Sequence, residues 1–496
     1  MFRFSKFPLV LAVASVFILV VIATLIAHTR DTLVLANPPE LYSRNGRLSV
    51  TLHAVLDATG HDSFAFNGRP VAPILRAWPG DTIQIEYVND LPQQSPEKCL
   101  IPPCMDMTNL HFHGLHVSPN APQDDVLTMM AKPGQSLHYA VQIPTDQTPG
   151  LFWYHTHPHG ESYQQVRDGM SGAIVIEGMD RYVPELRNMP ERVLVVRGKF
   201  IADDPQASAE LRQVQISPPC GSESEPPAEI FTVNGQLRPR IPVAPLERQF
   251  WRIVNASADR YLDVQVGNRP FEIVALDGMP LAYHDPAHPK KVATHILVPP
   301  AGRVEAIVTG PPDGAHAALQ TLCVATGADG DPNPGMILAD LVPGIPSAPH
   351  RPKPVNHPAP PDYKTLDLHA AEQTQPDFVA IFTEDKKGFY INSQLFQPDS
   401  APLRRSRVGT YEHWRILNAT AELHPMHIHQ VHFLAFAENE HPLPNPVWLD
   451  TVNVPTGGSV DVIMDFTDPV IRGMSLFHCH LLNHEDKGMM AKILFE

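Results

Sequence analysis

Histidines recur in pairs of the form His-x-His, and such pairs can bind metal ions. The chain has 26 histidines in 496 residues, and ten of them fall in four short motifs. On a β-strand, residues i and i+2 point to one face about 6.6 Å apart, so each pair directs two imidazoles at one site. Four pairs supply enough imidazoles for a centre of several metal ions. The motifs are His111-Phe-His113, His155-Thr-His157, His424-Pro-Met-His427-Ile-His429 and His478-Cys479-His480-Leu-Leu-Asn-His484.

Cys479 lies between two of these histidines and would face the opposite side of their strand. Its thiolate, together with His424 and His484, makes a His₂Cys set, and Met489 follows as a candidate weak axial ligand. This donor set is typical of a blue-copper electron-transfer site. An all-histidine cluster on the other face suits copper that acts on oxygen. One strand would then serve two sites, with the peptide between them as a covalent path for electrons.

A threefold repeat indicates the elements that position these residues. The stretches 82–89, 250–255 and 413–418 resemble one another, and each precedes a Pro/Gly turn and an alternating apolar run. Their final asparagines, Asn89, Asn255 and Asn418, lie 166 and 163 residues apart, which indicates repeated domains and not a solenoid. Short Val- and Ile-rich strands, broken by Pro, Gly, Asn and Asp, predict antiparallel β-sandwiches.

We therefore predict an all-β fold of three consecutive sandwich domains after an N-terminal apolar helix. The middle domain is expected to lack metal ligands. Aligning Asn255 with Asn418 places Tyr261, Val264 and Val266 at the positions of His424, His427 and His429, so this domain is expected to be a spacer. The expected segments are a leader at 1–30, domains at 38–180, 190–342 and 362–496, and a stiff Pro-rich linker at 343–361.

The four motifs resemble those of the three-domain multicopper oxidases, which include laccases, ascorbate oxidase and bacterial copper-efflux oxidases. The resemblance covers nearly the whole chain after residue 40. It implies cupredoxin-like Greek-key domains, four copper ions and reduction of O₂ to water. It assigns His424, Cys479, His484 and Met489 to type 1 copper, with Met490 as the alternative axial ligand. It assigns the other ligands as follows: His111 and His427 to type 2 copper; His113, His155 and His480 to one type 3 copper; and His157, His429 and His478 to the other.

Carboxylates near the motifs are candidates for proton transfer, because reducing O₂ to two waters consumes four protons. The resemblance gives this role to Glu485 and Asp124, with Asp125 as the alternative to Asp124. Asp450 is expected either to orient a type 1 histidine or to cap a turn. Asp486 is expected at the surface.

Composition narrows the partners and the bonding. The formal net charge of −16 disfavours a nucleic-acid partner. Five cysteines are too few for a disulfide-built scaffold. Cys99, Cys104, Cys220 and Cys323 can form up to two disulfides in three connectivities, and the sequence does not choose among them. It does not indicate an oligomeric state either.

The N-terminus carries an export signal of one of two kinds. Arg3 and Lys6 precede an uncharged, mostly apolar run of 21 residues from Phe7 to Ala27. This run is long enough to span a membrane. We expect either an uncleaved anchor or a cleaved signal peptide, and both place the rest of the chain in the periplasm or on the extracytoplasmic face. The protein would be soluble if the segment is removed.

The resemblance implies O₂ as the acceptor and leaves the reductant open. We expect first a laccase-like oxidase that takes single electrons from phenolic or aromatic substrates. The alternative is oxidation of Cu(I) or Fe(II) in metal homeostasis. Methionines or carboxylates gathered over His484 would favour the metal ion, and an open apolar groove would favour phenols. A copper-free structural factor of the cell envelope is a remote third, since every ligand position is filled.

Overall fold

The structure is a computed structural model that describes residues 34–93, 106–200, 211–218, 220, 229–350 and 375–496. The expected N-terminal helix, Cys99, Cys104 and most of the Pro-rich linker lie outside these residues. Within the described ranges, no helix is both long enough and apolar enough to cross a membrane.

Six sheets form three face-to-face pairs, one pair for each domain, which confirms the predicted all-β fold of three sandwiches. The first domain contains the sheets β4-β3-β2-β6-β8 and β1-β5-β10-β9-β7. Its elements are β1 (Glu40–Tyr42), β2 (Arg47–Leu56), β3 (Asp62–Phe66), β4 (Arg69–Pro70), β5 (Ile74–Ala77), β6 (Thr82–Asn89), β7 (His111–His113), β8 (Ser136–Gln142), β9 (Gly150–His155), α2 (Ser162–Asp168) and β10 (Ser171–Ile176).

The second domain follows two short 3₁₀ turns, Met179–Arg181 and Pro184–Asn188. Its sheets are β12-β11-β14-β20-β16-β17, with β18 beside β16, and β13-β22-β21-β15-β19. Its elements are β11 (Glu191–Phe200), β12 (Glu229–Val233), β13 (Arg240–Val243), β14 (Arg248–Asn255), β15 (Leu262–Val266), β16 (Phe271–Leu276), β17 (Met279–Pro280), α4 (Leu281–His284), β18 (Lys291–Ala293), β19 (Ile296–Val298), β20 (Arg303–Thr309), β21 (Ala317–Leu322) and β22 (Met336–Pro343).

The third domain contains the sheets β24-β23-β26-β31-β28-β29 and β25-β33-β32-β27-β30. Its elements are β23 (Phe378–Asp385), β24 (Gly388–Ile391), β25 (Arg404–Ser406), β26 (Thr410–Asn418), β27 (His424–Ile428), β28 (Phe433–Glu438), β29 (His441–Leu449), β30 (Thr451–Val454), β31 (Ser459–Phe466), a 3₁₀ turn (Pro469–Ile471), β32 (Gly473–Cys479), α6 (Leu482–Asp486) and β33 (Met490–Phe495).

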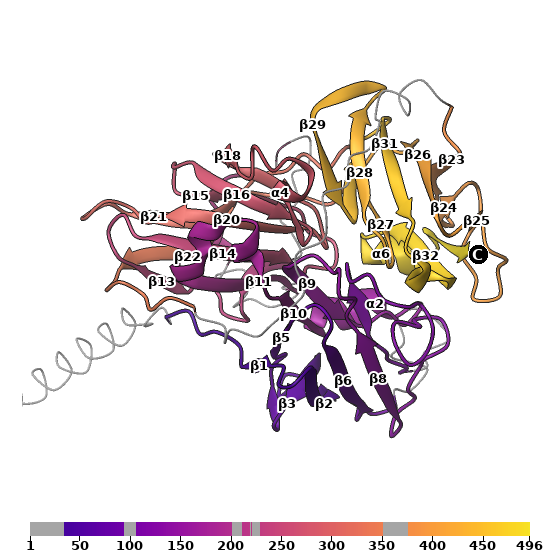
Figure 1. Cartoon of the computed structure of the whole chain (residues 1–496), viewed down its shortest axis with the longest axis horizontal. Helices are drawn as coiled ribbons and strands as arrows, with labels where there is room; N and C mark the ends of the chain where they lie inside the picture. Colours follow the sequence, from indigo (N-terminus) through magenta and orange to yellow (C-terminus); the bar gives the residue numbers. More distant parts are fainter. Residues whose placement is uncertain (1–33, 94–105, 201–210, 219, 221–228, 351–374) are drawn as a thin grey trace, which may run out of the picture.

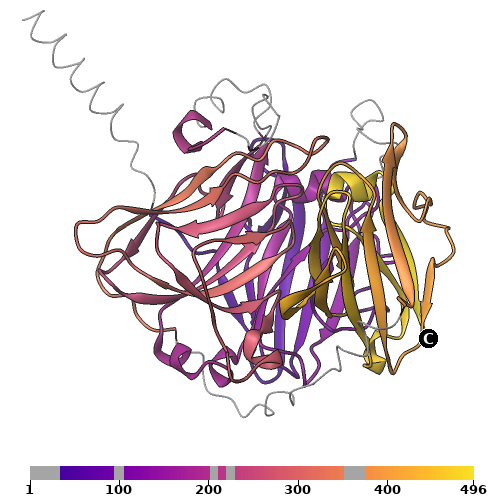
Figure 2. The same ribbon diagram turned by 90° about the horizontal axis from the view of Figure 1, so that it is seen from above.

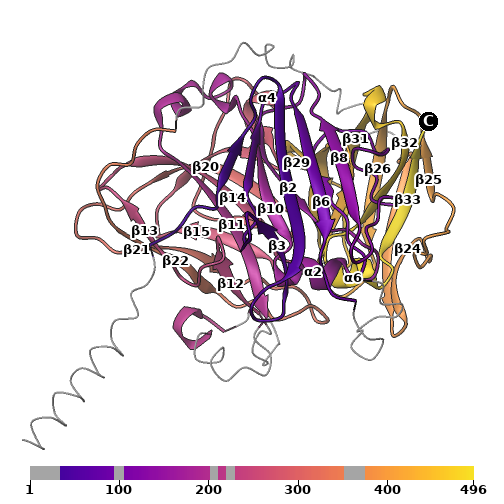
Figure 3. The same ribbon diagram turned by 90° about the horizontal axis from the view of Figure 1, so that it is seen from below.

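The three domains pack against one another around a common centre. Figure 1 shows the second and third domains side by side above the first, and Figure 2 shows the same grouping from above. Figure 3, from below, places β2, β6 and β8 of the first domain across the front. Residues 34–36 precede the first domain but bind the second, because the Leu35 amide donates to the Arg240 carbonyl at 2.8 Å. The Leu35 side chain is buried in the core of the second domain.

The sandwiches are mainly antiparallel, as expected, but their sheets also contain parallel pairs that the sequence did not predict. In each domain the repeat strand has one parallel neighbour, in the pairs β2/β6, β11/β14 and β23/β26. In the first domain the chain passes through β5 of the opposite sheet between β2 and β6, so β6 returns in the direction of β2. On its other side each repeat strand pairs antiparallel with the run after the Pro/Gly turn, in β6/β8, β14/β20 and β26/β31.

The repeated asparagines hold the loops that follow the repeat strands. The buried Asn255 side chain donates to the carbonyls of Arg260 at 2.8 Å and Val298 at 3.0 Å, and accepts from the Ser257 amide at 3.3 Å. Asn89 and Asn418 make the corresponding bonds in the other domains. An amide side chain supplies both donors and an acceptor, which explains why this residue type recurs at all three positions.

We predict that Asn255→Ala lowers the free energy of unfolding by about 2–4 kcal/mol, because two buried carbonyls lose their donor. The measurement is thermal or urea unfolding of the full chain. Asn268→Ala changes an exposed asparagine in the same domain and should stay within about 0.5 kcal/mol of the unsubstituted protein. Equal effects of the two substitutions would contradict the role of Asn255.

Candidate metal centres

Eight fully buried histidines meet between the first and third domains. In the first domain His111 lies opposite His155 across β7 and β9, and in the third domain His427 lies opposite His478 across β27 and β32. Residues that face each other across a ladder point to the same side of the sheet. The two sets stack on each other, with ring centroids 3.7 Å apart for His111 and His429 and 3.8 Å apart for His113 and His427.

The eight imidazoles divide into groups whose ring nitrogens lie within 4.8 Å of one another. Two groups are the triads that the sequence assigned to the type 3 pair: His113, His155 and His480, and His157, His429 and His478. A third group brings His111 and His427, the expected type 2 ligands, together with His113. The structure therefore brings all eight predicted histidines to one place.

The ring nitrogens face one another at distances that suit a shared metal ion. Nε2 of His478 lies 3.2 Å from Nε2 of His429 and 3.4 Å from Nε2 of His157. Two nitrogens that each lie about 2.0 Å from one ion, at a near-tetrahedral angle, are about 3.3 Å apart. In His111, His155 and His427, Nδ1 contacts an oxygen while the buried Nε2 has no hydrogen-bond partner among the described residues. Such a nitrogen is costly to bury unless it binds a metal ion.

A second donor group lies in the core of the third domain. It consists of His424, Cys479 and His484, all buried. The Cys479 Sγ lies 3.4 Å from Nδ1 of His424, which lies 3.4 Å from Nδ1 of His484. The Thr420 hydroxyl lies 2.8 Å from Nε2 of His424, and this contact leaves Nδ1 to face the thiol. Two imidazoles and a thiol in this arrangement match the predicted His₂Cys set.

The two adjacent methionines have different neighbours. Met489 packs in the hydrophobic cluster that contains Cys479, while Met490 packs with Val126, Phe396 and Leu476 in another cluster. The Cys479 amide also donates to the Met489 carbonyl at 3.0 Å. The packing therefore places Met489, and not Met490, on the side of the thiol.

The end of β32 connects the two donor groups. His478 and His480 belong to the histidine cluster, and Cys479 belongs to the other group. Nδ1 of His478 donates to the Cys479 carbonyl at 2.9 Å. A covalent path and a hydrogen bond thus join the thiol to one histidine triad.

Burial keeps these imidazoles neutral, which is the state that binds metal ions. It lowers the pKa of His155 and of His424 to about 3 and the pKa of His478 to about 4. Burial and neighbouring histidines lower the pKa values of the other cluster histidines well below their ordinary range. Burial also raises the pKa of the Cys479 thiol, so a cation is required for the thiolate to form.

Asp124 contacts the cluster and Asp125 does not. The Asp124 carboxylate lies 3.0 Å from Nδ1 of His111 and accepts from the Phe112 amide at 3.0 Å and from the Gln430 side chain at 2.6 Å. Asp125 instead accepts from the amide of Thr128 at 2.9 Å in the next turn.

Glu485 also reaches the cluster. Its carboxylate oxygens lie 3.1 Å from Nδ1 of His478 and 3.6 Å from Nδ1 of His157, so it contacts two ligands of one triad. Burial, reinforced by the charge of Asp486, raises the pKa of Glu485 well above its ordinary value. A carboxyl group that holds its proton in this position can donate it inside the cluster.

One of the two alternatives for Asp450 was wrong, and the expectation for Asp486 holds in part. Asp450 does not contact a type 1 histidine: its carboxylate lies 3.2 Å from Nε2 of His113, and its carbonyl accepts from Nδ1 of His427 at 2.8 Å. Asp486 is partly exposed, as expected, but its carboxylate also accepts from the amides of Gly160 at 2.9 Å and Tyr163 at 2.9 Å. These bonds tie α6 to the start of α2, and Figures 1 and 3 show the two helices side by side.

Arg303 of the second domain, which the sequence analysis missed, fixes Asp450. Both terminal nitrogens of its guanidinium bind the Asp450 carboxylate, at 2.6 and 2.7 Å. A Cβ on Gly114 would lie 2.4 Å from this guanidinium and 2.5 Å from the carboxylate, and Gly114 has φ +84°. The glycine that follows His111-Phe-His113 therefore leaves room for the ion pair.

The comparisons with known proteins agree with this geometry. Three family models, each described as multicopper oxidase, match residues 49–181, 153–339 and 357–496. The chain belongs to the multicopper oxidase family. The oxidase is 24% identical, over 87% of its length, to multicopper oxidase mco of Staphylococcus haemolyticus, of which 83% is covered. It is 27% identical, over 78% of its length, to a laccase of Haloferax volcanii, of which 67% is covered.

The fold of the oxidase matches a solved multicopper oxidase from Campylobacter jejuni that is described as a metallo-oxidase. The TM-score is 0.69 and the sequence identity 23%, covering 93% of this chain and 95% of the other. Family membership confirms the expected class, an oxidoreductase that uses O₂. The donor sets described above fit the copper ions that the family implies.

A cavity of about 760 Å³ opens over His484. His484 stacks on Phe389, with ring centroids 3.9 Å apart, and its Nε2 lies 3.4 Å from the carboxylate of Glu422. Burial, followed by the hydrogen bond and charge of Glu384, raises the pKa of Glu422 to about 9. Six carboxylates line this outer cavity: Asp259, Asp329, Asp331, Glu384, Asp385 and Glu422. None of the six was predicted from the sequence, and only Glu422, two residues before His424, lies near a motif.

A second cavity of about 580 Å³ lies on the Asp124 side of the histidine cluster. Gln430, which donates to Asp124, and His432 are in its wall. His116 also lines it, with Nε2 2.8 Å from Nδ1 of His432. On the opposite side of the cluster, His159 packs beside His157 and Phe396, with ring centroids 6.2 and 4.8 Å apart.

We predict that the buried histidines contribute stability to the copper-free protein that is lost as the pH falls from 6.5 toward 4, while buried carboxyl groups with raised pKa values, such as Glu422 and Glu485, change the stability in the opposite direction. A histidine with a lowered folded pKa takes up its proton mainly on unfolding, so stability present above pH 6.5 is lost below it. For His155, His424 and His478 the loss at pH 5 is about 2 kcal/mol each. Urea unfolding of the copper-free protein and of its His424→Gln variant at several pH values isolates the contribution of one histidine. A difference in the free energy of unfolding between the two proteins that does not change from pH 6.5 to pH 5 would contradict the prediction.

We predict that Met489→Leu raises the reduction potential of the type 1 copper in the loaded protein, because a weak thioether donor to the copper is removed. Redox titration of the blue absorption measures the potential. Met490→Leu is the matched control and should leave the potential unchanged. The axial assignment fails if Met489→Leu leaves the potential unchanged or lowers it.

Proposed function

We propose that this oxidase takes electrons from a divalent metal ion of the Fe(II) type. Four Fe(II) ions give up four electrons and become Fe(III), while one O₂ and four protons become two waters. The observation that carries the proposal is the wall of the outer cavity, where six carboxylates surround the approach to His484.

The donor atoms of the cavity favour a hard cation. Carboxylate oxygens suit ions such as Fe(II) and Mn(II), whereas Cu(I) prefers thiolate and thioether sulfur. Among the described residues that line the cavity there is no methionine or cysteine, and Lys386 is the one lysine or arginine. Burial, followed by the neighbouring Glu384, raises the pKa of Glu422, and a cation placed beside Glu422 would offset both effects.

Glu422 is the carboxylate best placed to hold the substrate ion. Its oxygen lies 3.4 Å from Nε2 of His484, and Nδ1 of the same ring faces the His424 and Cys479 donor group. An ion on Glu422 would therefore be one imidazole ring away from the type 1 site. Copper held there and in the histidine cluster supplies the capacity to take electrons singly and to deliver four of them to O₂.

This proposal reverses the order of substrates expected from the sequence, and the carboxylates of the cavity support it. Phenols were placed first and metal ions second, on the condition that carboxylates over His484 would favour the metal ion. The names of the relatives support both classes, because one is a laccase and another is described as a metallo-oxidase. The preference therefore rests on the cavity itself. Apart from its fellow ligand His424, Phe389 is the one ring that contacts His484 among the described residues.

We also propose export of the protein. The uncharged run from Phe7 to Ala27, preceded by Arg3 and Lys6, supports translocation of the rest of the chain. Whether the segment stays as an anchor is decided by N-terminal sequencing of the mature protein: an intact Met1 indicates an anchor, and a start near residue 30 indicates cleavage.

Oxygen consumption by the copper-loaded full-length chain tests the substrate class. Fe(II), Cu(I) and 2,6-dimethoxyphenol are supplied separately, and Cys479→Ser is the inactive control. We predict the highest kcat/KM with Fe(II). Fast turnover of dimethoxyphenol together with no turnover of Fe(II) would refute the proposal. A higher kcat/KM with Cu(I) than with Fe(II) would make Cu(I) the substrate ion.

We predict that Glu422→Gln lowers kcat/KM for Fe(II) about tenfold, because a carboxylate at the site of the ion is lost. Turnover of neutral dimethoxyphenol should change less than twofold. The matched control is Glu438→Gln, an exposed glutamate outside the cavity. An equal loss with Fe(II) and with dimethoxyphenol would show damage to the type 1 site and would contradict the role of Glu422.

A further inference from the structure

The second domain holds a short loop against the third domain beside the outer cavity. The loop runs from Cys323 to Asn333 and is closed by a hydrogen bond from the Val324 amide to the Asn333 carbonyl at 3.0 Å. The Thr326 hydroxyl donates to the Asp331 carbonyl at 2.8 Å, within the loop. The Asn333 side chain donates to the Tyr261 carbonyl at 3.1 Å, so the end of the loop is attached to its own domain.

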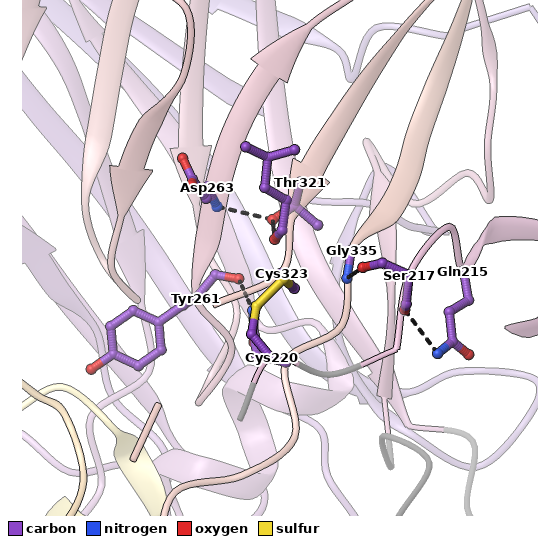
Figure 4. The surroundings of a disulfide bond; sticks show 10 residues. Gln215, Ser217, Cys220, Tyr261, Asp263, Thr321, Cys323 and Gly335 are labelled. Atoms are coloured by element: carbon purple, nitrogen blue, oxygen red, sulfur yellow. Dashed lines mark hydrogen bonds between the residues drawn. A yellow bond between two sulfur atoms is a disulfide. The ribbon is translucent and has the colours of Figure 1, made fainter. Parts of the chain in front are cut away.

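A disulfide anchors the start of the loop. Cys323 is bonded to Cys220, which settles the pairing of two of the four cysteines that the sequence left open. Figure 4 shows this disulfide beside Tyr261, whose ring points away from the two sulfur atoms. Tyr261 lines the outer cavity, and its buried hydroxyl has no hydrogen-bond partner among the described residues. The loop and Tyr261 thus form one wall of the cavity.

The loop docks on the segment that carries Glu422. The Leu423 amide donates to the Thr326 carbonyl at 2.7 Å, and the Ala328 amide donates to the Ala421 carbonyl at 2.8 Å. Gly327 pairs with Glu422 between these two bonds. Gly327 has φ +114°, and a Cβ there would lie 2.1 Å from the Ala421 carbonyl oxygen. Only glycine allows this close approach without moving the backbone.

The backbone of Glu422 is therefore held from both domains. Gly327 contacts it from the second domain, and within the third domain the Asn418 side chain donates to its carbonyl at 2.7 Å. The second domain also supplies three of the six carboxylates of the cavity: Asp259, Asp329 and Asp331. Asp329 and Asp331 are exposed residues of the loop.

We infer that the loop 323–333 of the second domain determines which reductant the oxidase accepts. Gly327 is a positioning residue that sets Glu422 over His484, and Asp331 adds charge that attracts a cation. This inference rests on the proposed function, because it concerns selection of a metal ion in the same cavity. The expected spacer is then a part of the substrate site.

The test compares two loop variants of the copper-loaded full-length oxidase with Fe(II) and with neutral 2,6-dimethoxyphenol. Gly327→Ala lifts the loop from residues 421–422, and Asp331→Asn removes one charge without changing its shape. Asp313→Asn is the matched control, an exposed aspartate of the same domain outside the cavity. For each variant, KM and kcat are measured with both donors, and the blue absorption reports on the type 1 site.

We expect KM for Fe(II) to rise about tenfold in Gly327→Ala and several-fold in Asp331→Asn, because the ion loses attraction and its carboxylate is displaced. For both loop variants, the kinetics with dimethoxyphenol and the blue absorption should stay within about twofold of the unsubstituted oxidase. For the control Asp313→Asn, KM and kcat with both donors should stay within the same limit. Asp331→Asn keeps the test decisive if Gly327→Ala does not fold.

Two results would overturn the inference while leaving the proposed function intact. One is an unchanged KM for Fe(II) in both variants. The other is a parallel loss with both donors, which would give the loop a purely structural role. If the unsubstituted oxidase turns over dimethoxyphenol but not Fe(II), the proposed function fails and this inference fails with it.

Discussion

The alternation of side chains on β32 is the constraint on which the rest of the molecule depends. Successive residues of a strand face opposite sides, so His478 and His480 leave the sheet toward the first domain while Cys479 enters the core of the third. Every other donor must come to these two faces. The first domain brings β7 and β9 to one face, and β27 brings ligands to both. The contact between the domains is therefore part of the metal centre.

The same constraint explains what the sequence predicted and what it could not. Pairs such as His111 and His113 are local, and strand geometry alone places them on one face. Glu422 over His484, Arg303 on Asp450, and Asp486 on the amides of α2 depend on contacts between residues far apart in the sequence. No local pattern predicts such contacts. For the same reason Asp124 and Asp125 could not be told apart from the sequence, since only the fold turns one toward His111.

The threefold repeat gave the right architecture and an incomplete account of the middle domain. Val264 and Val266 replace ligands and are buried in its hydrophobic core, as their residue type requires. Residues of this domain nevertheless reach the functional centres. Arg303 orients the aspartate beside His113, and the loop 323–333 borders the outer cavity. The loops of this sandwich contact the other two domains, and loops are where a rigid β-fold commonly carries its functional residues.

The position of the ligands along the chain has a consequence for biosynthesis. His478, Cys479, His480, His484 and Met489 all lie within the last 19 residues of 496. The chain is synthesised from its N-terminus, so the first two domains can fold before these residues exist. Neither donor group is complete until residues 478–489 have been synthesised. A product that stops before them therefore has no assembled site in which copper could react with oxygen, and metal loading must follow their synthesis.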